Sequence, residues 1–359
     1  MTTLTTGLYA RIKDLPVTID EVTIRTISNE NPDWERLTTE FTLTGAGHSG
    51  RGEDVIWWPE DHQALPPLVD NISTVLAGSR TVGEIDDLLA TVQLFPGGHD
   101  PGIYIDYRRW GIASAAADLA MRQADTNLSK VLGIEPQPLR FAHSMGLGDN
   151  PKATDVTDWL QYDPDLEFKL DATDKWSEDL IATLAGTGRV CVIDLKSYYT
   201  FEAVRQDADT DLYAKIGAAF GDAYIEDAAV EDNMLAALGE AAARLSFDAP
   251  IHSIDDVKAL TVTPAAINIK PSRFGTWQRL LDTVDYCREQ GYELYGGGQF
   301  ELAIGRTHAQ QLASLLYPHG PNDIAPVVFH TAQPGPDLPS SPLTLPFDTG
   351  FGFDAAGAR

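Results

Sequence analysis

The sequence has few cysteines, few basic residues and no long apolar run, and each shortage excludes a class of protein. Its two cysteines, Cys191 and Cys287, lie in apolar or helical patterns without metal-ligand spacing, which argues against a disulfide scaffold or a cysteine metal site. No apolar run approaches the roughly 20 residues that span a bilayer. The N-terminus also lacks the basic-then-apolar pattern of a signal peptide. We therefore expect a cytoplasmic protein with reduced cysteines.

Basic residues are outnumbered two to one. The chain has 26 Lys and Arg against 53 Asp and Glu, a net charge of −27. Such a surface repels nucleic acid and anionic membranes, so neither is expected as a partner. The acidic residues are spread along the chain, as in proteins adapted to high salt, where screening weakens self-repulsion. We expect a halophilic protein with a solvated acidic surface.

The pattern of predicted helices and strands changes along the chain. The first hundred residues or so indicate an α+β region, with a strand at Thr38–Gly45 followed by a glycine-rich surface or lid loop, "GAGHSGRGEDV". Apolar spacing and a final glycine predict a helix over Trp110–Gly133. Eight short apolar segments then alternate with helical patterns: "PLRFAHS", "LEFKLDA", "RVCVIDLKSYY", "AYIEDAAV", "RLSFDAPI", "AINIKPS", "YELYGGGQF" and "DIAPVVF". This alternation predicts an α/β fold with a (β/α)₈ TIM-like barrel.

Charged residues stand at the ends of the predicted barrel strands, where barrel enzymes carry their chemistry. In chain order they are Lys169, Asp171, Asp194, Lys196, Glu226, Asp248, Lys270 and Glu301, with Gln299 beside the last. Residues two apart on a strand share a face, so Lys169 with Asp171, and Asp194 with Lys196, can both point inward. The joint pattern favours a functional site over a set of structural ion pairs.

Three of these carboxylates, Asp194, Glu226 and Asp248, follow consecutive strands and form a set of oxygen ligands suited to Mg²⁺. Lysines flank the set on both sides. A lysine in a desolvated or cation-rich place loses its proton more readily and can act as a general base. A metal that neutralises a carboxylate and a lysine that removes the adjacent proton together make an enolisation site.

These residues resemble the enolase superfamily, in its muconate-cycloisomerase and mandelate-racemase-like branches. "YRRWGIASAAADLAMRQADTNLSKVLG", "YIED", "INIKPSRFG" and "GGGQFELAIGRTHAQQLASL" resemble its lead-in helix, strand-four glutamate, strand-six lysine and strand-seven segment. The resemblance implies a capping domain (1–105), a barrel with its lead-in helix (106–335) and a tail returning to the cap (336–359). It also implies Asp194, Glu226 and Asp248 as metal ligands, Lys270 as base, and Glu301 beside the enediolate.

The sequence departs from this family pattern at two strands. Strand two usually offers Lys-x-Lys but here reads "FKLDA", so either Lys169 or Asp171 holds the catalytic position. Strand three usually reads Asp-x-Asn but here reads "DLK", which puts Lys196 beside the metal. These changes favour one-base chemistry over two-base racemisation. We expect a lyase that dehydrates a hydroxy acid, such as a sugar acid, with racemisation or cycloisomerisation as alternatives.

The remaining expectations concern substrate and partners. The substrate is a small carboxylate, bound by Glu301, Gln299, Ser144 and Asn268, and selected by the cap segment "GHSGRGEDVIWWPEDHQ". We expect a homo-oligomer.

Three other functions stay open. Ser144 lies in "AHSMG", which echoes the G-x-S-x-G elbow of serine hydrolases, but the helix that the elbow requires does not follow it. Lys270 could instead form a Schiff base, as in lysine-dependent aldolases. A non-catalytic metal-binding barrel is the third. His143, His252 and His308 are expected in the core or behind the site rather than in catalysis.

Overall fold

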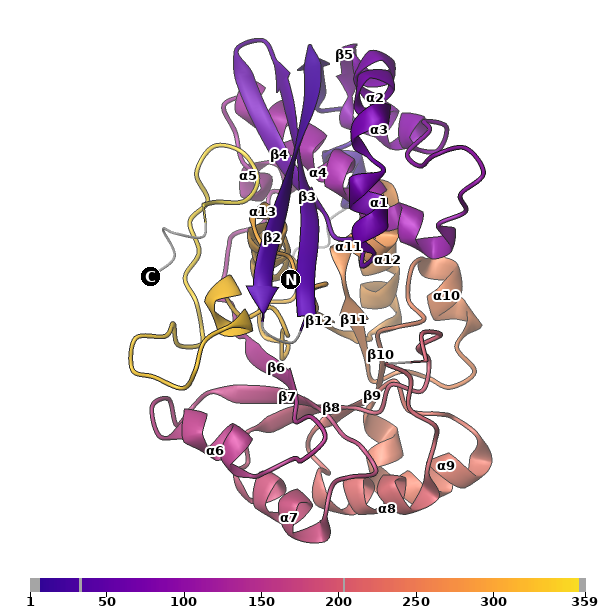
Figure 1. Cartoon of the computed structure of the whole chain (residues 1–359), viewed down its shortest axis with the longest axis vertical. Helices are drawn as coiled ribbons and strands as arrows, with labels where there is room; N and C mark the ends of the chain where they lie inside the picture. Colours follow the sequence, from indigo (N-terminus) through magenta and orange to yellow (C-terminus); the bar gives the residue numbers. More distant parts are fainter. Residues whose placement is uncertain (1–6, 32–33, 203, 355–359) are drawn as a thin grey trace.

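The N-terminal part of the molecule is built from two antiparallel sheets and short helices (Figure 1). The computed structural model describes residues 7–31, 34–202 and 204–354. One sheet contains β2 (Glu21–Asn31), β3 (Trp34–Gly45) and β4 (His48–Asp54), and the other pairs β1 (Pro16–Ile19) with β5 (Gly78–Thr81). The helices are α1 (Pro59–Gln63), α2 (Val69–Leu76) and α3 (Val82–Leu89), with 3₁₀ turns at Tyr9–Arg11, Pro66–Leu68 and Gly102–Tyr104. The α+β expectation for this region is therefore met.

The glycine-rich segment after β3 is a strand, so its prediction as a surface or lid loop was wrong. Only the turn at Ala46 and Gly47 separates β3 from β4, and both residues have positive φ. The glycines serve packing: a Cβ at Gly50 would lie 2.2 Å from the backbone nitrogen of Leu119, and one at Gly52 would lie 2.0 Å from the carbonyl of Gly111. They let β4 lie directly against the lead-in helix α4 (Ile105–Gln123).

The predicted helix over Trp110–Gly133 is split into α4 and α5 (Leu128–Leu132). The break follows from Asp125, whose φ of +48° is incompatible with a helix, and from Asn127, whose side chain accepts a hydrogen bond from the backbone N–H of Lys130 and caps α5. Gly133, with φ +60°, ends α5 as expected.

Seven parallel strands form the curled sheet of the C-terminal part (Figure 1). They are β6 (Ala142–Gly146), β7 (Glu167–Asp171), β8 (Val190–Asp194), β9 (Tyr224–Glu226), β10 (Leu245–Phe247), β11 (Ala266–Ile269) and β12 (Glu293–Gly296), neighbours in chain order. The helices between and after them are α6 (Thr154–Leu160), α7 (Glu178–Gly186), α8 (Thr210–Ala219), α9 (Asp232–Leu238), α10 (Ile254–Ala259), α11 (Pro271–Phe274), α12 (Trp277–Gln290) and α13 (Ile304–Leu316), with a 3₁₀ segment at Gly239–Arg244. The predicted α/β class, a parallel β/α barrel beneath an antiparallel cap, is confirmed.

The eighth barrel strand, predicted at "DIAPVVF", is reduced to two residues. The carbonyl of Asn322 accepts a hydrogen bond from the N–H of Ala142 on β6 (2.8 Å), and the N–H of Asp323 donates to Gly296 on β12 (2.8 Å). These contacts close the gap between the first and last strands. Pro326 has no N–H to continue a ladder, and a 3₁₀ turn follows at Val327–His330.

Alternation along the strands separates the helix-facing side from the barrel interior. On β7, Phe168 and Leu170 are in the apolar core while Lys169 forms ion pairs inside the barrel. A small interior cluster of Val192, Tyr224, Ala266 and Tyr295 fills the space below the strand ends. The charged side chains therefore form a layer above an apolar and aromatic floor, at the end of the barrel that faces the cap.

Candidate active site

Three carboxylates at the ends of β8 and β9 form a close group. Oxygen atoms of Asp194, Glu226 and Asp227 all lie within 4.8 Å of one another, and the three side chains are fully buried. Asp194 and Glu226 are the last residues of their strands. Asp227 follows with φ +51°, and its two oxygens accept the N–H groups of Asp248 and Ala249, each at 2.9 Å. The backbone thus fixes Asp227 beside the other two.

The electrostatics of this group suit a divalent cation. Burial, together with the neighbouring carboxylates, raises the pKa of Glu226 well above its ordinary value. Burial and the charges of Asp248 and Asp194 raise the pKa of Asp227 to about 7. Three crowded and fully buried carboxylates are costly unless cations neutralise them. Hard oxygen donors are what Mg²⁺ prefers, so these residues fit the metal that the sequence predicts.

Asp248, predicted as the third ligand, is held by two cations. Its carboxylate lies 2.9 Å from the Nζ of Lys270 and 2.7 Å from an Nη of Arg273, and it accepts the hydroxyl of Tyr199 at 3.1 Å. Burial alone would raise the pKa of Asp248, but the charges of Arg273 and Lys270 lower it below its ordinary value. Asp248 as a ligand stays a prediction. Asp227 was missed, although the adjacent acids of "YIED" were a visible signal.

Lys169 lies among three carboxylates inside the barrel. Its Nζ forms ion pairs with Glu226, with Asp323 at 2.9 Å and with Asp194 at 3.6 Å. Burial opposes its charge, yet these carboxylates raise its pKa well above the ordinary value. Lys169 therefore neutralises the site rather than accepting protons in this arrangement.

Lys196 and Asp171, the two departures from the family pattern, form an ion pair on neighbouring strands. The Nζ of Lys196 lies 3.2 Å from Asp171 and 2.9 Å from the Oδ2 of Asp194, and it sits 4.9 Å above the ring of Tyr199. Lys196 has φ +51°, which is uncommon for a residue other than glycine, and its N–H donates to the Oδ1 of Asp194 at 2.9 Å. With this backbone conformation, both the N–H and the ammonium group of Lys196 contact the carboxylate of Asp194.

Lys270 directly follows β11 and is 7% exposed. Its Nζ pairs with Asp248. The glycines of "GGGQF" lie at the end of the adjacent strand, β12, and directly after it. A Cβ at Gly297 would lie 2.5 Å from the Cε of Lys270, 2.5 Å from the Oδ1 of Asn268 and 2.7 Å from the Oδ1 of Asp323. The absence of a side chain at Gly297 therefore lets Lys270, Asn268 and Asp323 pack directly against the backbone after β12.

The predicted substrate-binding residues lie on β6, on β11 and in the loop after β12. Asn268 donates to Glu226 at 3.0 Å, and its Oδ1 is buried without a hydrogen-bond partner among the described residues. Ser144 pairs in register with Lys169 on the neighbouring strand. Glu301 accepts the N–H of Gln299 at 2.7 Å and forms an ion pair with Arg306 at 3.1 Å. Their role in binding remains a prediction.

Cap residues that the sequence did not single out hold the loop after β12 in place. Arg36 on β3 donates to the carbonyls of Gln299 (2.8 Å) and Phe300 (3.3 Å). Glu53 on β4 accepts the N–H groups of Leu302 (2.7 Å), Ala303 (3.0 Å) and Gly305 (2.8 Å) at the start of α13. The cap segment "GHSGRGEDVIWWPEDHQ" thus contributes Glu53, and also Trp57, whose indole donates to Gln299 at 3.1 Å.

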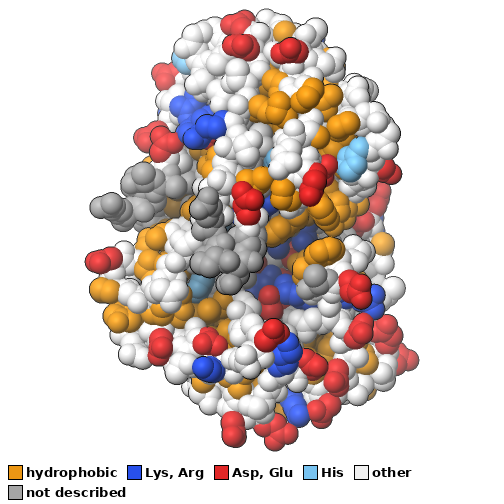
Figure 2. Space-filling model, in the orientation of Figure 1, with side chains coloured by type: hydrophobic (Ala, Val, Ile, Leu, Met, Phe, Trp, Pro, Cys, Tyr) orange, Lys and Arg blue, Asp and Glu red, His pale blue; other side chains and the backbone are white. Residues whose placement is uncertain are grey.

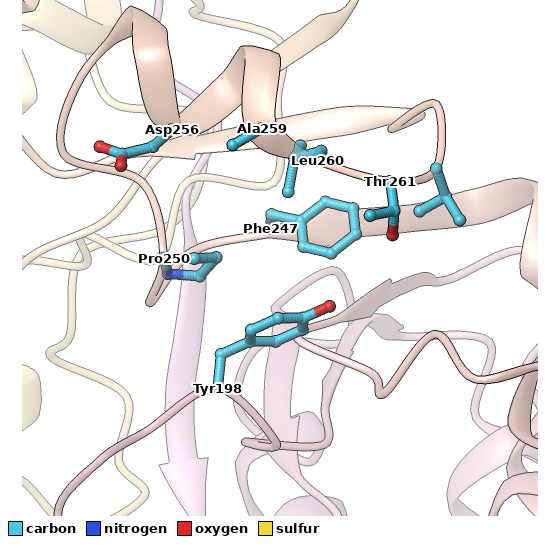
Figure 3. A pocket seen from close by; sticks show the side chains of 8 residues that line it. Tyr198, Phe247, Pro250, Asp256, Ala259, Leu260 and Thr261 are labelled. Carbon is cyan, nitrogen blue, oxygen red and sulfur yellow. The ribbon is translucent and has the colours of Figure 1, made fainter.

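The surface shows two hollows of different character. Figure 2 shows basic and acidic side chains deep in a hollow between the upper and lower parts of the molecule, with apolar side chains above it. Figure 3 shows a second pocket, of about 210 Å³, where Phe247 of β10 and Tyr198 face Pro250 and Leu260. Ser246 beside Phe247 bonds Tyr295 inside the barrel, so Phe247 points to the outside. The second pocket therefore lies away from the charged layer.

One alternative, the serine hydrolase, loses support from the surroundings of Ser144, and one histidine lies as expected. No helix follows Ser144 directly, because the next helix, α6, begins at Thr154, so the geometry of a nucleophile elbow is missing. His143 packs against Trp159 and Phe329, and burial lowers its pKa to about 4. His143 is a neutral core residue, as expected.

Known families match nearly the whole chain. Two family models, described as the N-terminal and C-terminal domains of a domain of unknown function, DUF8230, match residues 10–131 and 135–331. The chain belongs to the DUF8230 family. The N-terminal model of this family includes α4 and all of α5 except its last residue, Leu132.

Solved structures similar to this DUF8230 protein share its fold. An enolase-superfamily member from Listeria innocua is 18% identical, covers 95% of this chain and 94% of its own, and has a TM-score of 0.67. Muconate cycloisomerase from Pseudomonas fluorescens is 16% identical over 96% of both chains, with a TM-score of 0.66. Muconate lactonizing enzyme from Pseudomonas putida is 17% identical over 88% and 90%, with a TM-score of 0.65. The resemblance to the enolase superfamily is confirmed for the fold.

A sequence relative supports the same placement over a short segment. o-Succinylbenzoate synthase from Bacillus subtilis (strain 168) is 35% identical over 83 residues, which are 23% of this chain and 22% of that enzyme. In the described part of the chain, none of the helices has the length and apolar character needed to cross a membrane.

Proposed function

We propose that this protein is a Mg²⁺-dependent enzyme that removes the proton α to a carboxylate and stabilises the resulting enediolate. The enolase-superfamily fold and the carboxylate group of Asp194, Glu226 and Asp227 support it. The metal would be held by Asp194 and Glu226, with Asp227 or Asp248 as the third carboxylate. When bound, it would supply positive charge to the substrate carboxylate.

The observation that carries the proposal is the unequal pairing of the lysines at the strand ends. Within the described residues, Lys169 has ion pairs with three carboxylates and Lys196 with two, whereas Lys270 has one with Asp248. Asp248 also forms an ion pair with Arg273, so its carboxylate stays paired when Lys270 moves away. Lys270 is therefore our candidate for the base.

The reaction we propose first is loss of water from a hydroxy acid, such as a sugar acid. Lys270 takes the α-proton, and the C–H electron pair moves into the carboxylate to form the enediolate. That pair then forms a carbon–carbon double bond as the β-hydroxyl leaves. The proton on Lys270 joins the leaving hydroxide to form water, so one base serves both steps. The Asp171–Lys196 pair, in place of a second free lysine, supports one-base chemistry.

A second candidate is cycloisomerisation, which the likeness to muconate cycloisomerase favours. It uses the same enediolate and the same base, but the product keeps all atoms of the substrate. Mass spectrometry of the product separates the two candidates, because dehydration removes one water and cycloisomerisation removes nothing.

The test is α-proton exchange in D₂O, followed by NMR with a panel of hydroxy acids and unsaturated diacids in the presence of Mg²⁺. We expect exchange in the wild type and a loss of at least about a thousandfold in Lys270→Ala, as for removal of a general base together with its positioning. Lys215→Ala is the control, because Lys215 lies on helix α8, where it pairs with Asp211 at 2.7 Å. Exchange that survives in Lys270→Ala would move the base to Lys169 or Lys196.

A further inference from the structure

Lys196 occupies both oxygens of a carboxylate that belongs to the candidate metal group. Its Nζ lies 2.9 Å from the Oδ2 of Asp194, and its backbone N–H donates to the Oδ1 at 2.9 Å. Asp194 is fully buried at the end of β8. Any cation that uses Asp194 therefore meets an ammonium group already in place.

Mg²⁺ and this ammonium group compete for the same oxygen. Mg²⁺ holds its ligands at about 2.0–2.1 Å in near-octahedral geometry and tolerates little distortion. A lysine ammonium on the same carboxylate repels the divalent cation and takes up a lone pair that the cation needs. A bound Mg²⁺ thus favours a position of Lys196 away from Asp194.

Asp171 provides that second position. Its Oδ1 lies 3.2 Å from the Nζ of Lys196, and the register of β7 and β8 puts Asp171 directly beside Asp194. The side chains of Asp171 and Lys196 are 27% and 14% exposed, whereas that of Asp194 is fully enclosed. Movement of the ammonium group toward Asp171 therefore takes it toward the open side of the site, and the backbone at φ +51° need not change.

We propose that Lys196 is a positioning residue that shifts from Asp194 to Asp171 when a divalent cation binds, so that Asp171 sets how tightly the site holds the cation. This inference rests on the metal site of the proposed function, and it joins the two departures from the family pattern into one device. Lys196 weakens cation binding, and Asp171 restores part of it by accepting the lysine.

The experiment measures Mg²⁺ affinity of the full chain by isothermal titration calorimetry. The four proteins are the wild type, Lys196→Asn, Asp171→Asn and the double variant. Asparagine suits position 196 because it tolerates positive φ. We expect Lys196→Asn to tighten binding by about tenfold or more, since a competing positive charge leaves the site.

The double variant separates the shift of Lys196 from a general effect of charge. Asp171→Asn should weaken Mg²⁺ binding about fivefold or more when Lys196 is present, but less than about twofold when position 196 is asparagine, because coupled residues are non-additive. A long-range field effect of Asp171 would give equal losses in both backgrounds, and that result would overturn the proposal. Unchanged or weaker binding in Lys196→Asn would also overturn it.

Further variants keep the test decisive. The Lys196→Arg variant retains the positive charge, so its Mg²⁺ affinity should lie within about threefold of that of the wild type. A tenfold gain in affinity in this variant would contradict the competition between charges. This test does not depend on whether Lys196→Asn folds. Lys175→Asn, at an exposed pair, should leave the affinity unchanged. Absence of Mg²⁺ binding in all proteins would overturn both this proposal and the metal site. Absence of α-proton exchange, with the affinity pattern intact, would overturn only the proposed function.

Discussion

Two buried, charged regions of this protein are organised in different ways. The first is the barrel mouth, formed by the charged residues at the strand ends from Lys169 to Lys270. The second, which we call the cap–barrel junction, consists of Arg36, Glu53, Asp54 and Arg108, all almost fully buried. Both regions combine acidic and basic side chains, and they differ in what those charges contact.

Backbone groups partner the charges of the cap–barrel junction. Arg36 donates to five carbonyls, including those of Val55 (2.7 Å) and Ile56 (2.5 Å). Arg108 donates to the carbonyls of Leu94 and Asp61 as well as to the carboxylate of Asp54. Because a carbonyl or an N–H cannot move without the chain, such contacts fix the cap on the barrel and cannot be rearranged by a ligand.

Side chains partner the lysines of the mouth. Lys169, Lys196 and Lys270 pair with carboxylates of other strands, and the Oδ1 atoms of Asn268 and Asp323 are buried without a hydrogen-bond partner in the described part of the chain. Positive φ at Lys196 and Asp227 adds strain. Unpartnered atoms and strain persist where binding or chemistry requires them. The comparison teaches that charges paired with backbone groups hold the structural frame, which is the cap–barrel junction. Charged side chains paired with one another form the candidate site.

The largest expected effect comes from breaking the junction at Arg108. Arg108→Met should lower the free energy of unfolding by about 3–5 kcal/mol, because it removes the ion-pair partner of the fully buried Asp54. Urea denaturation with EDTA present measures the change.

The matching controls separate charge from packing. The double variant Asp54→Asn, Arg108→Met should lose less than Arg108→Met alone, since no charge is then stranded. Arg205→Met, at an exposed pair with Asp207, should change stability by less than about 0.5 kcal/mol. If Arg108→Met lost as little stability as Arg205→Met, the distinction between the cap–barrel junction and the barrel mouth would be wrong.

The second effect concerns pH and the helix that Glu53 caps. His308 on α13 is fully buried, stacks on Phe351 of the C-terminal tail and contacts its carbonyl at 3.1 Å. Burial, assisted by the charges of Arg51 and Arg122, lowers the pKa of His308 to about 3. The unfolded chain therefore takes up a proton at higher pH than the folded chain, and stability is lost as the pH falls below about 6.5.

At pH 5 this one histidine should cost about 2 kcal/mol of stability relative to pH 7. His308→Gln, which can still donate to the carbonyl of Phe351, should remove that part of the pH dependence when unfolding is followed from pH 7 to pH 5. His319→Gln, at an exposed position, should leave the profile unchanged. Parallel profiles for the wild type and His308→Gln would contradict the assignment.

Local patterns were enough to predict most of the barrel and much of its mouth. A short apolar strand followed by a charge, as in "CVID", "YIE" and "AINIK", shows both the strand and the side chain that its end presents. The strand-end rule therefore located Asp194, Glu226 and Lys270 without any knowledge of neighbours. The same rule overlooked Asp227, because alternation along a strand turns the residue after Glu226 to the opposite face, and only its positive φ brings Asp227 to the group.

Long-range contacts could not be predicted in this way. Glu53 and Arg36 read as ordinary strand residues, and only the folded chain brings them to the loop after β12. The glycines at 50 and 52 suggested a loop, although they permit close packing on α4. The eighth strand failed because Asn322 and Asp323 close the barrel with two hydrogen bonds before Pro326 ends the ladder.

The smallest expected effect sharpens the comparison most. Lys270→Met should change the free energy of unfolding by less than about 1 kcal/mol, because Asp248 keeps Arg273 at 2.7 Å and the hydroxyl of Tyr199 at 3.1 Å, so no carboxylate is stranded. Lys258→Met, at an exposed lysine, is the matched control, again by urea denaturation with EDTA. A loss above about 3 kcal/mol would make Lys270 part of the frame. A near-zero change in the free energy of unfolding, together with the loss of α-proton exchange, would instead show that Lys270 serves function and not stability. No residue of the cap–barrel junction should behave in this way.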